Sequence, residues 1–263
     1  MNARHLIPLA IAGTGLALVA GTAPAYAGTT PSPTPSTSTG GGAAARTCSA
    51  DRLAYVQARV DAAVKKRQVT IDRLTSALAA RTHVTDAHRA TLSGTYSADS
   101  SGLAAVDAKV QSDTTCGEAV ADGRTVVTDY RVYLLLVPQT HLVAASDTGT
   151  YAAGQLAAAE PKAQAAIDAL TDPQEKAAAQ AKLDDLTAQV ATATTALSGV
   201  ADAMLALKPA DIPAQLATID GYRAKVASAH EDMRRAIADA KALKALLGHP
   251  AAGPAATPSS TSS

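Results

Sequence analysis

TDPQEKAAAQAKLDDLTAQVATATTALSGVADAMLAL (residues 171–207) carries the most regular apolar repeat of the sequence. Its apolar residues recur every seven positions in two registers three residues apart: Leu183, Val190, Leu197 and Met204, then Leu186, Ala193, Val200 and Leu207. A seven-residue repeat places its members along one side of an α-helix. Burying each large side chain contributes about 1.5–3 kcal/mol, whereas an isolated alanine-rich helix is marginal in water. The repeat therefore predicts a helix over 173–207 that needs a partner.

Start and stop signals bound this helix and predict that partner. Asp172 is the expected N-cap and Pro173 fits the first turn. KPADIP (208–213) ends the helix, and a second apolar stripe predicts a helix over 213–247 that Gly248 stops. The stripe comprises Leu216, Ile219, Tyr222, Val226, Met233, Ile237, Leu243 and Leu247. Two long helices joined by a tight turn predict an antiparallel hairpin.

The N-terminal half shows the same kind of pattern. Residues 49–81 carry apolar side chains at helical spacing: Leu53, Val56, Val60, Val64, Ile71, Leu74 and Leu78. After a short turn, Asp86 is the expected cap of a second helix that reaches about Asp113. The stretch SADSSG (97–102) weakens the second pattern, and a break or loop there stays open.

The chain contains two cysteines, Cys48 and Cys116. Two antiparallel helices return the chain to its starting end, so the hairpin 48–116 should bring Cys116 beside Cys48. In an oxidising compartment such a pair forms a disulfide. Closing a loop of this length stabilises the fold by about 4 kcal/mol. Two separate buried thiols are the alternative, and because two cysteines lack the spacing of a zinc site, no metal is expected.

RVYLLLVPQTHLVAA (131–145) is strongly apolar and could be a membrane span, a strand or a helix. Only six apolar residues separate Arg131 from Pro138, too few to cross a bilayer. A lone strand would leave its backbone unpaired. Helical spacing therefore favours a buried helix over 118–147, bent at Pro138 because proline lacks an N–H. A loop at 147–150 and a helix over 151–170, which Pro161 could divide, should follow.

The bend at Pro138 is the candidate ligand pocket. Such kinks can shape a pocket, although a core helix bending around its neighbours is the simpler interpretation. Aromatic, cationic and polar side chains gather near it in the sequence: Tyr130, Arg131, Tyr133, Gln139 and His141. The alternative is that the tyrosines are core aromatics.

Both ends of the chain differ from its middle. Residues 1–27 combine a basic start, a short apolar run and Ala25-Tyr26-Ala27, as a secretory signal peptide does, and a retained anchor is the alternative. A Pro-, Ser-, Thr- and Gly-rich linker (28–46) and a similar tail (250–263) are expected to be disordered. A helical domain over 47–249 lies between them.

Composition points to an all-α fold. The chain is rich in alanine, the best helix former, and has no Phe or Trp. We therefore expect an elongated antiparallel helical bundle of coiled-coil hairpins with disordered N- and C-terminal tails. The 23 basic and 23 acidic residues balance, so the chain lacks the electrostatic footprint of nucleic-acid binding.

The residues TDYRVYLLLVPQTHLVAASD (128–147), behind a signal peptide and before two long alanine-rich helices, resemble secreted helical proteins of actinobacteria. That group has no assigned activity. The resemblance implies export and a helical fold, and it supplies no catalytic residue.

Motifs of hydrolases, phosphate loops and redox cysteines are missing from the sequence. His83 and His88 stand five apart and should not share a helical face. We therefore expect no enzyme and no cofactor, and interpret the chain as an exported cell-envelope or extracellular scaffold or interaction module. Its expected partners are a protein or a second copy bound through the helical seam, with contact to the cell wall, and neither nucleic acid nor, after signal cleavage, a membrane span. The alternative is a small-ligand-binding protein with its pocket at Pro138.

Overall fold

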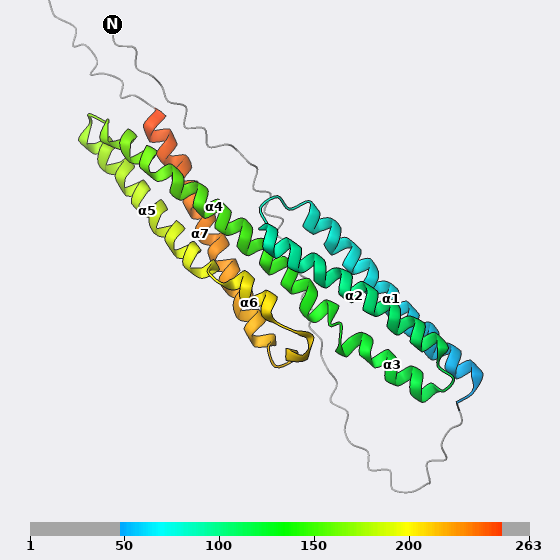
Figure 1. The fold of residues 1–263 in the computed structure, drawn as a ribbon. Helices are drawn as coiled ribbons and strands as arrows, with labels where there is room; N and C mark the ends of the chain where they lie inside the picture. Colours follow the sequence, from blue (N-terminus) through cyan, green and yellow to red (C-terminus); the bar gives the residue numbers. More distant parts are fainter. Residues whose placement is uncertain (1–47, 249–263) are drawn as a thin grey trace, which may run out of the picture. The chain divides into compact units, whose positions relative to one another are not determined.

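The computed structural model describes residues 48–248, and this part is built from helices without a strand (Figure 1). Five long helices pack in antiparallel fashion: α1 (Ala50–Ala79), α2 (Asp86–Ser112), α4 (Val137–Asp168), α5 (Pro173–Leu197) and α7 (Leu216–Gly248). Shorter elements join them: α3 (Cys116–Thr128), a π-helical turn η1 (Val132–Leu136), α6 (Val200–Ala206) and a 3₁₀ turn η2 (Pro209–Asp211). The predicted all-α class is confirmed.

Helices α1, α2 and α3 pack on one another, and their starts have the caps that such residues favour. Ser49 caps α1, and its hydroxyl accepts the Arg52 N–H. The cap of α2 is Thr85, whose hydroxyl accepts the His88 N–H, so the prediction that Asp86 is the cap was off by one residue. Helix α2 continues through 97–102 without a break. There Gly102 lies against the Tyr130 ring, where a Cβ would collide with that side chain.

The disulfide Cys48–Cys116 is present, with its two Cα atoms 5.7 Å apart. It joins the residue before the α1 cap to the first residue of α3. Thr115 and Glu118 form a capping box, which starts α3 at Cys116 and holds that residue beside Cys48. The predicted pairing of the two helix ends is confirmed.

The predicted single helix over 118–147, bent at Pro138, was wrong. Helix α3 ends at Thr128, and Arg131 takes a left-handed backbone conformation (φ 31°, ψ 35°) before the π turn begins. In that turn the Val137 N–H bonds to the Val132 carbonyl, five residues back. Pro138 then lies in the first turn of α4. The chain accommodates the proline's missing N–H with a wider turn ahead of it rather than with a bend at the proline.

Helix α4 also contradicts the loop predicted at 147–150 and the division at Pro161, because it is continuous from Val137 to Asp168. Ser146 and Asp147 are buried, and their side chains bond to residues of α5 and to the cap of α2. They therefore do not bond to their own backbone, which would favour a loop. Gly149 lies against the Leu197 side chain, where there is no room for a Cβ.

The heptad seam is buried inside the chain. Helix α5 packs against α4 and α7, and α6 packs against α4. The seam residues that become buried are Leu183, Leu186, Val190, Ala193, Leu197, Val200 and Met204. The seam therefore has its partner helices within one molecule and needs no second copy to cover it.

The predicted helix over 173–207 is interrupted at Ser198 and Gly199. Gly199 has φ +70°, a conformation that glycine adopts without the steric cost of a Cβ, and α6 restarts after it. The last helix starts at Leu216 rather than at 213. The segment before this helix contains η2 and Ile212, which is extended, buried and directly followed by Pro213. An extended conformation is what a residue before proline prefers.

The predicted signal peptide (1–27), linker (28–46) and C-terminal tail (250–263) lie outside the described residues. Within residues 48–248, no helix combines the length and apolar character needed to cross a membrane.

Candidate functional site

A histidine and two carboxylates join helices α2, α4 and α6. The Nδ1 atom of His88 on α2 lies 2.9 Å from both carboxylate oxygens of Asp147 on α4. Its Nε2 atom lies 3.1 Å from Asp202 on α6. Asp147 is only 7% exposed and also accepts the backbone N–H of Thr85 at 2.9 Å. We call His88, Asp147 and Asp202 the His88 clasp.

The clasp changes the protonation of its histidine. Burial alone would lower the pKa of His88, but hydrogen bonds to Asp147 and Asp202, together with their negative charges, outweigh it and raise that pKa above its ordinary 6.5. The side chains that the ring contacts are carboxylates, and no hydroxyl or thiol nucleophile is among them. The arrangement therefore acts as a charge-assisted bridge between helices.

Stability should fall as pH rises through the folded-state pKa of His88. Because this pKa is raised, the folded chain holds the proton more tightly than the unfolded chain, so the stabilisation is complete below pH 6.5 and is lost above the folded pKa. His141 and His230 have lowered pKa values and act in the opposite sense. Urea unfolding of wild type and His88→Gln between pH 5 and about 8.5 should give a difference in the free energy of unfolding that shrinks with rising pH. A difference that stays constant with pH would contradict a stabilising role for the protonated ring.

Other buried polar side chains also join helices. Gln139 on α4 donates to the carbonyls of Met204 and Leu207, at 2.8 and 3.0 Å, and so satisfies the end of α6. Ser146 donates to the Leu197 carbonyl at the end of α5. The hydroxyls of Tyr96 and Thr140 lie 2.6 Å apart and connect α2 to α4. Each of these groups has its partner inside the bundle.

The five residues of the predicted pocket are distributed over different environments. Tyr130 packs against Gly102, and Gln139 is buried in the contacts with α6. The Nε atom of Arg131 is buried without a hydrogen-bond partner in the described structure. His141 is exposed on α4, although desolvation and the charge of Arg81 lower its pKa. Tyr133 lines a groove.

That groove lies between the middle of α1 and the π turn. It is lined by Lys65, Lys66, Val69, Thr70, Arg73 and Tyr133 and has a volume of about 390 Å³. The π turn buries Val132, Leu135 and Leu136 and leaves Tyr133 49% exposed. The Arg67 guanidinium lies over the Tyr133 ring, 5.3 Å from its centroid. The groove thus combines an aromatic ring with several cations. We call it the α1 groove.

Beside Tyr130, the half-buried carboxyl of Asp99 on α2 has a raised pKa. Burial raises the pKa of Asp99 from 3.8 to about 6. Burial, then the charges of Asp129 and Asp99, raise the pKa of Tyr130. Ionised Asp99 therefore opposes folding at neutral pH.

Replacing Asp99 by asparagine should stabilise the chain at pH 7 by about 1–2 kcal/mol. A raised folded-state pKa means that the native state favours the protonated acid, so stability is lost between pH 3.8 and about 6 as this half-buried carboxyl ionises. Below that window Asp99→Asn should have little effect. Denaturant unfolding at pH 7 and below pH 3.8 measures the change in stability. Asp107→Asn on the same helix is the matched control. Destabilisation by Asp99→Asn at pH 7 would refute the effect of burial.

A second groove lies between α4 and α5, near Pro161. It has a volume of about 510 Å³ and is lined by Glu160, Pro161, Gln164, Leu183, Asp184, Thr187, Ala188 and Ala191. The Gln164 and Gln180 side chains bridge the two helices there. Nothing in its lining distinguishes one class of ligand.

Sequence reasoning missed the His88 clasp. His88 and Asp147 are 59 residues apart, and the polar run around Asp147 reads as a loop. The part of the chain that the structure covers contains no group of three or more His, Cys, Asp or Glu side chains placed to hold a metal ion.

Comparison with models of known protein families, with curated proteins and with solved structures found no match for this chain.

Proposed function

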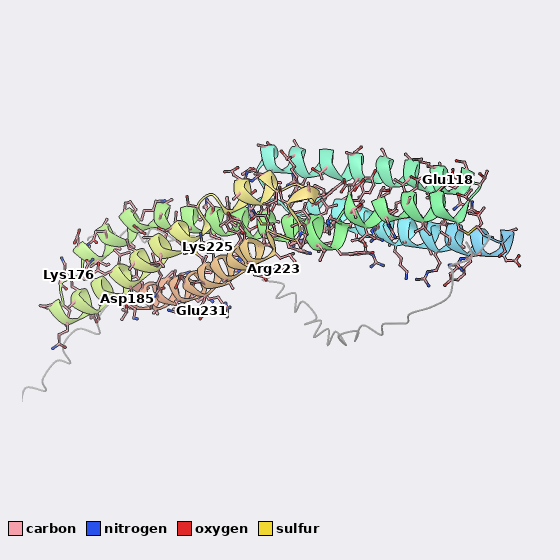
Figure 2. All side chains as sticks on the ribbon, turned by 90° about the horizontal axis from the view of Figure 1, so that it is seen from below. Glu118, Lys176, Asp185, Arg223, Lys225 and Glu231 are labelled. Atoms are coloured by element: carbon pink, nitrogen blue, oxygen red, sulfur yellow. A yellow bond between two sulfur atoms is a disulfide. The ribbon has the colours of Figure 1, made fainter. Side chains whose placement is uncertain are left out.

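We propose that this chain is an exported, non-enzymatic helical protein that acts as a cell-envelope or extracellular scaffold or interaction module. The observation that carries this proposal is the use of its buried polar groups. His88, Asp147, Gln139 and Ser146 each bond across helices, so they serve the fold. Function is then left to the surface, where charged side chains such as Asp185 and Arg223 face outward (Figure 2).

The disulfide supports the exported location. Disulfides persist in oxidising compartments and are rare in the cytosol. Cys48 lies shortly after the proposed leader (1–27) and linker (28–46), which would place the stapled helices outside the membrane. The resemblance of residues 128–147 to secreted actinobacterial proteins agrees with this and stays a prediction.

Crosslinking in living cells tests the function. A chain tagged at its C-terminus is crosslinked on the cell surface, purified under denaturing conditions, and its neighbours are identified by mass spectrometry. A specific envelope or extracellular protein partner, recovered with a chain that begins near Gly28, supports the proposal. Recovery of the chain from the cytoplasm with reduced cysteines, or without any specific neighbour, would contradict it.

The α1 groove favours a second candidate function, binding of a small ligand close to the turn before Pro138. Its volume of about 390 Å³ is within the range of small-molecule sites. A thermal-shift screen of metabolites would detect such a ligand. Stabilisation that disappears in Tyr133→Ala would support this function over the scaffold role.

A further inference from the structure

The α1 groove has an apolar centre with charges around it. Val69 and Tyr133 are 47% and 49% exposed although both are large and apolar in character. Lys66 and Arg73 lie on α1 on either side of Val69 in the sequence, seven residues and therefore about 10 Å apart along the helix axis. Protein interfaces have this anatomy of an apolar core and a polar rim, and tyrosine and arginine are enriched among their strongest contacts.

This surface carries an excess of positive charge. Residues 65–73 contain four cationic side chains (Lys65, Lys66, Arg67 and Arg73) and one carboxylate (Asp72), in a chain whose net charge is zero. Lys65 is paired with Asp61 at 2.9 Å, and Arg67 lies over the Tyr133 ring. Within residues 48–248 no carboxylate lies within ion-pair distance of Lys66 or Arg73. Two cations at the edge of the groove are thus free to meet an anionic partner.

The backbone beside the groove is held in an uncommon form. Arg131 has a positive φ, and the π turn that follows sets the position of Tyr133. Residues strained in this way and π turns both cluster at functional sites. The distortion leaves an aromatic side chain at the surface beside the cations of α1 rather than in the core.

From these observations we infer that the α1 groove binds an acidic segment of a partner protein. Carboxylates of the segment pair with Lys66 and Arg73, and an apolar side chain of the segment contacts Tyr133 and Val69. The inference rests on the interaction role proposed above and gives that role a surface and a class of partner.

Model polypeptides test the inference on the full mature chain. The probes are fluorescent poly-L-glutamate and a random glutamate–tyrosine copolymer, whose binding is followed by anisotropy at low salt. The copolymer should bind more tightly, because it supplies apolar side chains as well as carboxylates. Lys66→Glu combined with Arg73→Glu should weaken binding at least about tenfold, and Tyr133→Ala should remove the copolymer's advantage. Lys66→Gln with Arg73→Gln provides a milder pair, for which a smaller loss is expected.

A charge-matched control pair is Lys241→Glu with Lys244→Glu, exposed on α7 and outside the groove. This pair should leave binding nearly unchanged. An equal loss in the control pair would show unspecific attraction and overturn the inference. Displacement of the copolymer by inorganic polyphosphate at a lower concentration of anionic groups would overturn it too, because the groove would then favour a phosphate polymer.

The crosslinking experiment separates this inference from the proposed function. A protein neighbour that is still captured by the Lys66→Glu, Arg73→Glu chain would refute the groove as its docking surface and leave the interaction role standing. The absence of any specific neighbour for the wild-type chain would instead refute the proposed function. Loss of a captured neighbour in this variant, but not in the Lys241→Glu, Lys244→Glu chain, is the expected result.

Discussion

Replacing Cys48 and Cys116 together by serine should lower the free energy of unfolding by about 4 kcal/mol. The bridge joins residues 68 positions apart, so its removal restores a large amount of freedom to the unfolded chain. Denaturant unfolding of the wild-type and double-serine chains, monitored by circular dichroism, measures the difference. Hydrogen exchange should also accelerate most at the start of α1 and in α3, which the bridge holds together.

Reduction of the wild-type chain with a phosphine is the matched control, because these two cysteines are the only ones in the sequence. The reduced chain should have the stability of the double-serine chain and should keep its helical spectrum. A loss below about 1 kcal/mol on both routes would mean that the bridge contributes little to the folded chain.

Removing the imidazole of the His88 clasp should cause the second largest loss in the free energy of unfolding. His88→Ala leaves the buried carboxylate of Asp147 with the Thr85 N–H and without its charged partner. Breaking a buried pair in this way costs about 3 kcal/mol, because the remaining charge stays desolvated. Unfolding at pH 6, where the clasp histidine is protonated, measures the loss.

His83→Ala is the matched control for this variant. His83 is a nearby histidine whose ring stacks on Tyr151 with 3.9 Å between centroids, and it is not bonded to Asp147. Its loss should cost about 1 kcal/mol or less. Equal effects of the two substitutions would indicate that the clasp adds nothing beyond ordinary packing.

The long helices and the disulfide could be predicted because their signals are local or periodic. The stripe from Leu183 to Met204 repeats every seven residues, and every position of it in α5 and α6 is buried. Cys48 and Cys116 stand at the two ends of a helical hairpin, so helix length alone brings them together.

Two glycine-containing stretches show where local reasoning fails. SADSSG (97–102) looks like a weak point, yet α2 runs through it, because Gly102 is the residue that makes room for Tyr130. ALSGVA (196–201) lies inside the regular heptad, yet Gly199 takes a left-handed conformation and interrupts the helix. Glycine permits both outcomes, and long-range packing selects between them.

The candidate site was predicted only in part for a similar reason. The pocket residues were grouped on the expectation of one bent helix through Pro138. The break before Arg131 and the π turn change the directions in which the following side chains point from those of a continuous α-helix. Tyr133 therefore reaches the surface beside α1, while Gln139 is buried against α6. The cations of that groove belong to another helix, sixty or more residues earlier in the sequence.

Sedimentation equilibrium of the mature chain over a wide range of concentration tests most directly whether its helices satisfy one another within a single molecule. If α4 and α7 cover the heptad seam, the mass is that of one chain at every concentration and the helical content does not change on dilution. A dimer that loses its helical content as it dissociates would contradict this, since the seam would then require a second copy.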